Sequence, residues 1–249
     1  MPGPMPMLAR AGFWLLLPVA AVQGLWLRRT AARLPGATGH RRGIAGQGRP
    51  GNGSDLWLMA IGDSIIDGVG VERIEESFAV QFAAALADRS GRRVRWHLDG
   101  LSGRAIKDLL AALDRIDDPP RADVVLVSIG VNDVTGLSSL DAWRRNFGLL
   151  LERLRALWPA ARLLFAGLPA MERFPLPPQP LKYCLGIRAA ALDAEAARQI
   201  GNHPDAVHVP TRIDPRIHAF CDDGFHPSAE SCRLWAMELA AIESGRESP

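Results

Sequence analysis

The sequence has no aspartate or glutamate before Asp55, although the whole chain contains 27 acidic residues. The first 54 residues also hold seven arginines, so this head carries a formal charge of +7, whereas residues 55–249 carry −5. The total charge of +2 therefore describes neither part. Because the larger part is acidic and its basic residues are scattered, the composition excludes a chain-wide basic surface, and we expect no nucleic-acid partner.

Cysteine is scarce, with only Cys184, Cys221 and Cys232 in 249 residues. Three cysteines are too few for a disulfide scaffold, and their odd number leaves at least one unpaired. We expect them to be small core residues, which is the usual state of free cysteine. A hydrophobic content of 48% with 22% charged residues excludes general disorder. Residues 55–249 are enough for one domain with a sizeable core.

The uncharged stretch at residues 11–27 is shorter than the roughly 20 apolar residues that a membrane span needs. Three interpretations stay open: an uncleaved membrane anchor, which we favour, a cleaved secretory signal peptide, or a buried helix. Arginines concentrate after the stretch, so an anchor would leave the rest of the chain in the cytoplasm, whereas a cleaved signal would export it. We therefore expect membrane association, on a side that the sequence does not settle.

Residues 28–54 contain seven glycines, from Gly36 to Gly53, and few apolar side chains. This composition is typical of a flexible linker. We accordingly divide the chain into a hydrophobic anchor or signal segment at 1–27, a Gly/Arg-rich linker at 28–54 and one domain at 55–249.

From residue 55 onwards, short apolar runs alternate with segments whose apolar residues recur at helical spacing. This alternation predicts an α/β fold, with a five-stranded parallel sheet covered by helices on both faces. In such sheets the functional loops follow the carboxyl ends of the strands. The expected strands are 56–61, 93–98, 123–129, 162–166 and 207–209, and the expected helices are 77–89, 106–116, 140–157, 185–200 and 228–242.

Three polar segments follow the expected strands or precede the last helix. Ser64 comes two residues after Gly62, which ends the first apolar run, Asn132 follows the third strand, and Asp223 stands three residues before His226. A serine hydroxyl needs a base to become a nucleophile, and an aspartate in a tight turn can hold the imidazole that acts as this base. Each segment alone also suits a turn or a helix cap. Their order along one sheet edge favours a nucleophile, a base and an orienting carboxylate.

With these segments in order, the chain resembles the SGNH, or GDSL-type, hydrolases, which include bacterial esterases, thioesterases and lysophospholipases. The resemblance extends from Gly62 to His226, so it covers nearly the whole of the domain at 55–249. It rests on four segments: Gly62-Asp63-Ser64 with Gly68, Ser102-Gly103, Gly130-Val131-Asn132-Asp133, and Asp223-x-x-His226.

The resemblance implies a three-layer, flavodoxin-like fold and an esterase, lipase or thioesterase activity. It further implies that Ser64 attacks the acyl carbonyl, that His226 transfers the proton, and that Asp223 holds His226. The backbone N–H groups of Ser64 and Gly103 and the side-chain amide of Asn132 would form the oxyanion hole. No metal ion or organic cofactor is implied.

The proline-rich segment 168–183 leaves the same sheet edge, and it contains the apolar residues Met171, Phe174, Leu176 and Tyr183. We predict that these four residues form one wall of an acyl pocket, because such pockets are mostly apolar; an ordinary packed loop is the alternative. Two other functions stay open: a two-metal phosphoesterase, and a membrane-tethered binding protein with a vestigial triad. Esters of phospholipid, coenzyme A, sugar acetate and small alcohols all stay open as substrates, and so does the oligomeric state.

Overall fold

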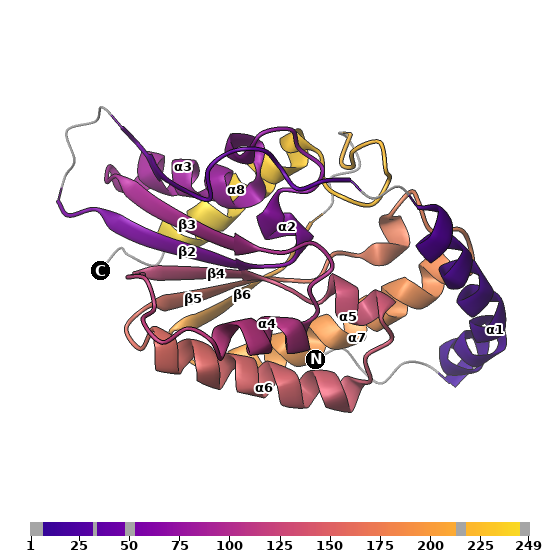
Figure 1. The fold of residues 1–249 in the computed structure, drawn as a ribbon. Helices are drawn as coiled ribbons and strands as arrows, with labels where there is room; N and C mark the ends of the chain where they lie inside the picture. The colour runs from indigo at the N-terminus through magenta and orange to yellow at the C-terminus, as the bar shows by residue number, and fades with distance from the viewer. Residues whose placement is uncertain (1–6, 32–33, 48–52, 213–217, 245–249) are drawn as a thin grey trace.

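The computed structural model describes residues 7–31, 34–47, 53–212 and 218–244, and in these residues a six-stranded sheet lies between two layers of helices (Figure 1). The sheet order is β1-β3-β2-β4-β5-β6, with β2 to β6 parallel and β1 antiparallel to β3. This architecture confirms the predicted α/β class. The strands are β1 Arg42–Ala45, β2 Leu56–Gly62, β3 Val94–Gly100, β4 Val124–Ser128, β5 Arg162–Ala166 and β6 Ala206–Val209.

The five parallel strands follow the flavodoxin-like order, in which the second strand along the chain lies outside the first. The direction of strand addition therefore reverses between β2 and β4. The crevice at the carboxyl ends of these two strands is where such sheets bind ligands. Ser64 follows β2 and Asn132 follows β4, so both residues lie beside this crevice.

Helices cover both faces of the sheet, as predicted (Figure 1). Helices α3 and α8 lie on one face, and α4, α6 and α7 lie on the other. Each of the five expected helices is present, with boundaries within a few residues of those expected. The helices are α1 Met7–Thr30, α2 Ser64–Asp67, α3 Phe78–Ser90, α4 Ile106–Leu113, α5 Val131–Thr135, α6 Leu140–Leu157, α7 Leu181–Ile200 and α8 Ala229–Ser244, with 3₁₀ turns η1 Ile74–Glu76 and η2 Met171–Arg173.

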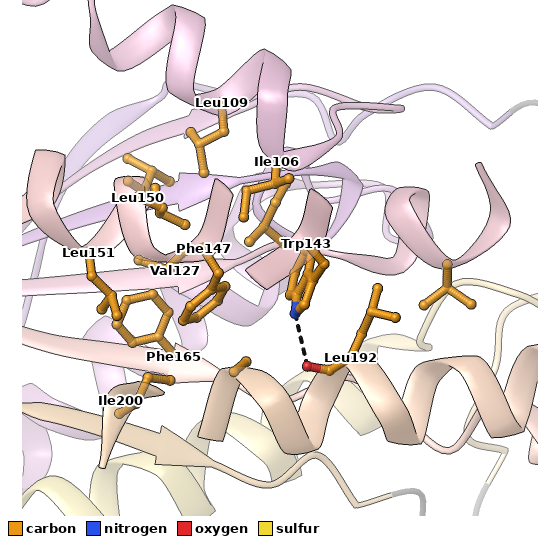
Figure 2. Close-up of a cluster of buried hydrophobic side chains, with 14 of the residues drawn as sticks. Ile106, Leu109, Val127, Trp143, Phe147, Leu150, Leu151, Phe165, Leu192 and Ile200 are labelled. Atoms are coloured by element: carbon orange, nitrogen blue, oxygen red, sulfur yellow. Dashed lines mark hydrogen bonds between the residues drawn. The ribbon is translucent and has the colours of Figure 1, made fainter. Parts of the chain in front are cut away.

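Alternate residues of the central strands supply the two halves of the core. Leu58 and Ala60 pack towards α3 and α8, whereas Met59 and Ile61 pack towards α4, α6 and α7. The second half includes Trp143, whose indole Nε1 donates a 2.9 Å hydrogen bond to the carbonyl oxygen of Leu192 (Figure 2). Because both faces of each central strand are buried, these strands are continuous apolar runs in the sequence.

Part of the predicted linker is instead folded onto the domain. The strand β1 pairs with β3, which makes the sheet one strand larger than expected. Just before it, the amide of Ala37 donates to the Asp67 carbonyl at 3.1 Å, and Arg41 pairs with the Asp67 carboxylate at 2.8 Å. The sequence did not predict β1, because these four partly exposed residues, with glycines on both sides, have neither the length nor the alternation of apolar and polar residues that is typical of a strand.

The N-terminal stretch lies within the continuous helix α1, and one side of this helix packs against α7 (Figure 1). The side-chain amide of Gln23 donates to the carbonyl of Gln179 at 2.7 Å and accepts from the amide of Leu181 at 3.0 Å. On its outer side, Val22 and Trp26 are exposed. None of the helices in the described residues is both long enough and apolar enough to cross a membrane. The predicted membrane association stays a prediction, and the side of the membrane stays open.

Candidate active site

Three side chains from two distant segments form a hydrogen-bonded chain at the carboxyl edge of the sheet. The Nε2 atom of His226 lies 3.1 Å from the hydroxyl oxygen of Ser64. Its Nδ1 atom lies 2.6 Å from the carboxylate oxygen Oδ2 of Asp223. When Nδ1 carries the ring proton, His226 donates to Asp223 and Nε2 is free to accept the proton of Ser64. The arrangement provides a nucleophile, a general base and a carboxylate that orients the base.

Ser64 reaches this position through a tight turn between β2 and α2. Gly62 has a φ of 155°, and a Cβ atom there would lie 1.9 Å from the carbonyl oxygen of Ser128. Only glycine lets β2 end this close to β4. Asp63 then caps α2, because its carboxylate accepts a 3.1 Å hydrogen bond from the amide of Ile65. Ser64 therefore opens a short helix with its hydroxyl facing His226.

The turn that carries His226 is organised around the carboxylate of Asp223. Its Oδ1 atom accepts from the amides of Phe225 and His226, at 2.8 and 2.9 Å, and from the Cys221 thiol at 3.0 Å. Burial acts to raise the pKa of Asp223, but the hydrogen bonds from Cys221, His226 and the backbone hold it below its ordinary value. The carboxylate therefore stays ionised at neutral pH.

The three cysteines have no disulfide partners, and Cys184 and Cys232 are buried as expected. Cys221 is only half-buried, and its contact with Asp223 was not expected from the sequence. Burial and the hydrogen bond to Asp223 raise the pKa of the Cys221 thiol to about 11. At neutral pH this residue is therefore a neutral hydrogen-bond donor to the carboxylate.

Gly103 and Asn132 are two of the predicted oxyanion-hole residues. Gly103 has a φ of 84°, which favours glycine, and a Cβ atom there would meet no atom within 4 Å, so the loop is open to a substrate. The side-chain nitrogen of Asn132 donates to the carbonyl of Arg104 at 3.0 Å. One amide hydrogen of Asn132 is thus held, and the other is left for an oxyanion.

Arg104 is a site residue that the sequence did not single out. Its side chain is only 7% exposed, and its Nη1 atom donates to the carbonyls of Gly62 at 3.2 Å and Asp99 at 3.0 Å. These contacts tie the ends of β2 and β3 to the loop of Gly103, while the carbonyl of Arg104 orients Asn132. Because its partners are mostly backbone carbonyls, no sequence pattern indicated this role.

Asp133, to which the sequence assigned no role, holds the short helix α5, which also carries Asn132. Its carboxylate accepts from the Ile106 amide and from the Ser138 hydroxyl, both at 2.9 Å. These bonds join the short helix α5 to the start of α4. In the residues that the structure describes, no three His, Cys, Asp or Glu side chains are grouped so that they could hold a metal ion.

A cavity of about 70 Å³ opens beside Ser64 and His226. Of the four residues predicted to form its wall, Phe174 lines it. Met171 is instead fully buried in the core, Leu176 is not among the lining residues, and Tyr183 is exposed on α7. Within the segment 168–183, Phe174 therefore lines the cavity. The end of this segment is the first turn of α7, on which Tyr183 is exposed. The sequence missed the other aromatic lining residues, namely Phe220, Phe225 and Trp235.

Through Asp63, the free energy of unfolding of the protein depends on pH. Burial raises the pKa of Asp63 to about 7, against the lowering effect of its hydrogen bond from Ile65. The folded-state pKa of Asp63 exceeds the reference value of 3.8. Its contribution to the free energy of unfolding is therefore fully present below about pH 4, where Asp63 is neutral, and is lost as the pH rises to about 7. That rise in pKa corresponds to about 4 kcal/mol of unfolding free energy.

We expect the Asp63→Asn variant, whose amide oxygen still accepts from Ile65, to lack this contribution. Urea unfolding of both proteins at pH 4 and pH 8 measures it. The variant should gain about 4 kcal/mol relative to the wild type between the two values. Equal pH dependence in both proteins would show that Asp63 is ionised in the folded state across this range.

The comparisons with known proteins agree with this geometry. The family described as GDSL-like Lipase/Acylhydrolase matches residues 60–234, which confirms the resemblance that the four motifs indicated. A GDSL-like esterase of Mycobacterium tuberculosis is 29% identical over 193 residues, and the match spans 73% of this chain and 60% of that protein's length.

Solved structures show the same fold. A lipase from a goat rumen metagenome superposes with a TM-score of 0.61 at 17% identity, over 76% of this chain and 97% of that one. An acetylxylan esterase from Geobacillus stearothermophilus superposes with a TM-score of 0.54 at 18% identity, over 79% of this chain and 96% of that one. At these identities the likeness concerns the fold alone.

Proposed function

Since the chain belongs to the GDSL-like lipase/acylhydrolase family, we propose that it hydrolyses carboxylic ester or thioester bonds through Ser64, His226 and Asp223. The observation that carries this proposal is the hydrogen-bonded chain from Asp223 through His226 to Ser64, at 2.6 and 3.1 Å. This chain lies at the strand edge beside a cavity that is largely apolar. It suits acyl transfer, because it activates a hydroxyl that is otherwise weakly nucleophilic.

In the first half of the reaction, the hydroxyl oxygen of Ser64 bonds to the acyl carbon while His226 Nε2 takes the hydroxyl proton. The negative charge passes to the former carbonyl oxygen, which accepts hydrogen bonds from the amides of Ser64 and Gly103 and from Asn132. When the tetrahedral intermediate collapses, the bond to the alcohol or thiol breaks, and His226 returns its proton to that leaving group. The acyl group is left bound to Ser64.

In the second half, water replaces the alcohol. His226 takes a proton from a water molecule while the oxygen of that water bonds to the acyl carbon. The same three donors bind the oxyanion again. Collapse then breaks the bond to Ser64, whose oxygen regains a proton from His226, and a carboxylic acid leaves. Throughout, Asp223 holds the His226 ring in place and stabilises its positive charge.

A fluorophosphonate probe tests the proposal directly, because it reacts with activated serines. We expect the wild-type protein to be labelled at Ser64 and to hydrolyse p-nitrophenyl acetate, and we expect Ser64→Ala to do neither. The matched control is Ser102→Ala, since Ser102 lies in an exposed loop near the site but outside the triad. Labelling that persists in Ser64→Ala would refute the assignment. Hydrolysis that is lost on adding a chelator would favour the metal-dependent alternative.

A further inference from the structure

A cluster of three phenylalanines lines the cavity beside Ser64 and His226. The ring centroid of Phe174 lies 4.9 Å from that of Phe220 and 5.1 Å from that of Phe225, in edge-to-face arrangements. The ring of Phe225 lies in turn 5.4 Å from the imidazole of His226. Aromatic pairs in this geometry attract one another beyond the gain from burial. The cluster therefore forms a defined wall in direct contact with the catalytic base.

Backbone contacts fix this wall to the turn that carries the triad. The amide of Leu176, two residues after Phe174, donates to the carbonyl of Gly224 at 3.0 Å. Phe220 forms a β-bridge with Pro227, the residue after His226, and the amide of Cys221 donates to the His226 carbonyl at 2.9 Å. The wall and the catalytic turn are thus one hydrogen-bonded unit, so the depth of the cavity is set together with the position of the base.

The volume of the cavity limits what it can hold. An apolar cavity of about 150 Å³ accommodates benzene, which corresponds to roughly 25 Å³ for each carbon atom. By this measure a cavity of about 70 Å³ holds about three carbon atoms. With the carbonyl carbon bonded to Ser64, the space beyond it suits a chain no longer than that of a butanoyl group.

The acyl group is the part of the substrate that this recess suits. The proposed oxyanion donors Gly103 and Asn132 are not among the residues that line the cavity, whereas Ala166, Gly167 and Leu168, at the end of β5 and after it, are. The acyl group stays bound to Ser64 through both halves of the reaction, whereas the alcohol has to leave after the first. A recess beside Ser64 fits the part that stays.

We infer that this protein acts on esters of short-chain carboxylic acids, from acetyl to butanoyl, and that Phe174, Phe220 and Phe225 set this limit. The inference rests on the proposed ester hydrolysis and adds the acyl class of the substrate. The alcohol lies outside the cavity and is not limited by it.

The test compares kcat/KM for p-nitrophenyl acetate, butanoate, hexanoate and octanoate in the wild type and in Phe220→Ala. Phe220 is half-buried, so it can be shortened with less risk to the fold than Phe174. We expect the wild type to prefer butanoate over octanoate by about tenfold or more, and Phe220→Ala to lose most of that preference. Phe174→Leu should shift the preference in the same direction. The matched control, Tyr183→Ala, removes an exposed aromatic outside the cavity and should leave the profile unchanged.

The inference would be overturned by a wild type that hydrolyses octanoate as efficiently as butanoate, or by a Phe220→Ala profile equal to that of the wild type. A series of acetate esters with different alcohols is measured in parallel. A Phe220→Ala effect on this alcohol series alone would also overturn it, because the cavity would then hold the leaving group. Fluorophosphonate labelling of Ser64 separates these outcomes from a failure of the proposed function. A labelled protein without a chain-length preference refutes only the limit, whereas an unlabelled wild type refutes ester hydrolysis itself.

Discussion

Replacing Asp223 with asparagine is expected to lower kcat by about 10⁴ while the protein still folds and binds substrate. The amides of Phe225 and His226 donate to one oxygen of the Asp223 carboxylate, so in the variant that position must be occupied by the amide oxygen. The amide nitrogen would then face His226 Nδ1, where Oδ2 stands now at 2.6 Å. It would donate to Nδ1 and force the ring proton onto Nε2. His226 could then no longer accept the proton of Ser64.

The matched control for this prediction is the neighbouring residue Asp222, whose side chain is exposed. Asp222→Asn makes the same chemical change one residue away, and its kcat should equal that of the wild type. Steady-state kinetics on a p-nitrophenyl ester, with circular dichroism to verify folding, measures both variants. If Asp223→Asn kept a kcat within tenfold of the wild type, the ring orientation would not depend on Asp223.

The Asn132→Ala variant is expected to lose between about a hundredfold and a thousandfold in kcat, with little change in KM. Asn132 is held by the carbonyl of Arg104 on one amide hydrogen, and its other hydrogen is available to the oxyanion. An oxyanion donor acts more strongly on the transition state than on the ground state, so its loss appears in kcat. Removing one such donor typically costs roughly 2.7–4 kcal/mol of transition-state stabilisation.

The control for Asn132 is Asn202→Ala, which removes an exposed asparagine side chain from the turn after α7. This variant should match the wild type in both kcat and KM. Asn132→Ala should also still be labelled by the fluorophosphonate, more slowly, because the triad is intact. An unchanged kcat would remove Asn132 from the oxyanion hole, and an increase in KM alone would make it a substrate-binding residue.

Most of the fold could be predicted because its elements carry strong local patterns. The strand at Val124–Ser128 is a run of buried apolar residues, and the helix at Leu140–Leu157 repeats apolar residues at helical spacing up to Pro159. The strand at Arg42–Ala45 carries no such pattern, because its place depends on the free edge of β3. Nor could the sequence show that α1 packs against α7, because the Gln23 contacts are to the backbone of Gln179 and Leu181.

The same distinction applies to the site. Ser64, Asn132, Asp223 and His226 could be proposed because each carries a chemical group at the end of an expected strand or before the last helix. Arg104 and Phe220 could not, because Arg104 acts largely on backbone carbonyls and Phe220 depends on two distant loops meeting. Sequence patterns therefore indicated the groups that we propose to react, but not those that position them or line the cavity.

The strand β1 also covers one edge of the sheet. An uncovered strand edge offers unpaired N–H and C=O groups to a strand from another molecule, which is a route to aggregation. Here β1 covers β3 over four residues and is itself short and begins with Arg42, while β6 at the opposite edge is also four residues long. Neither edge of the sheet is therefore a long strand with which another chain could pair. Residues 42–45, which composition predicted to be part of a flexible linker, thus cover a strand edge that would otherwise be open to such pairing.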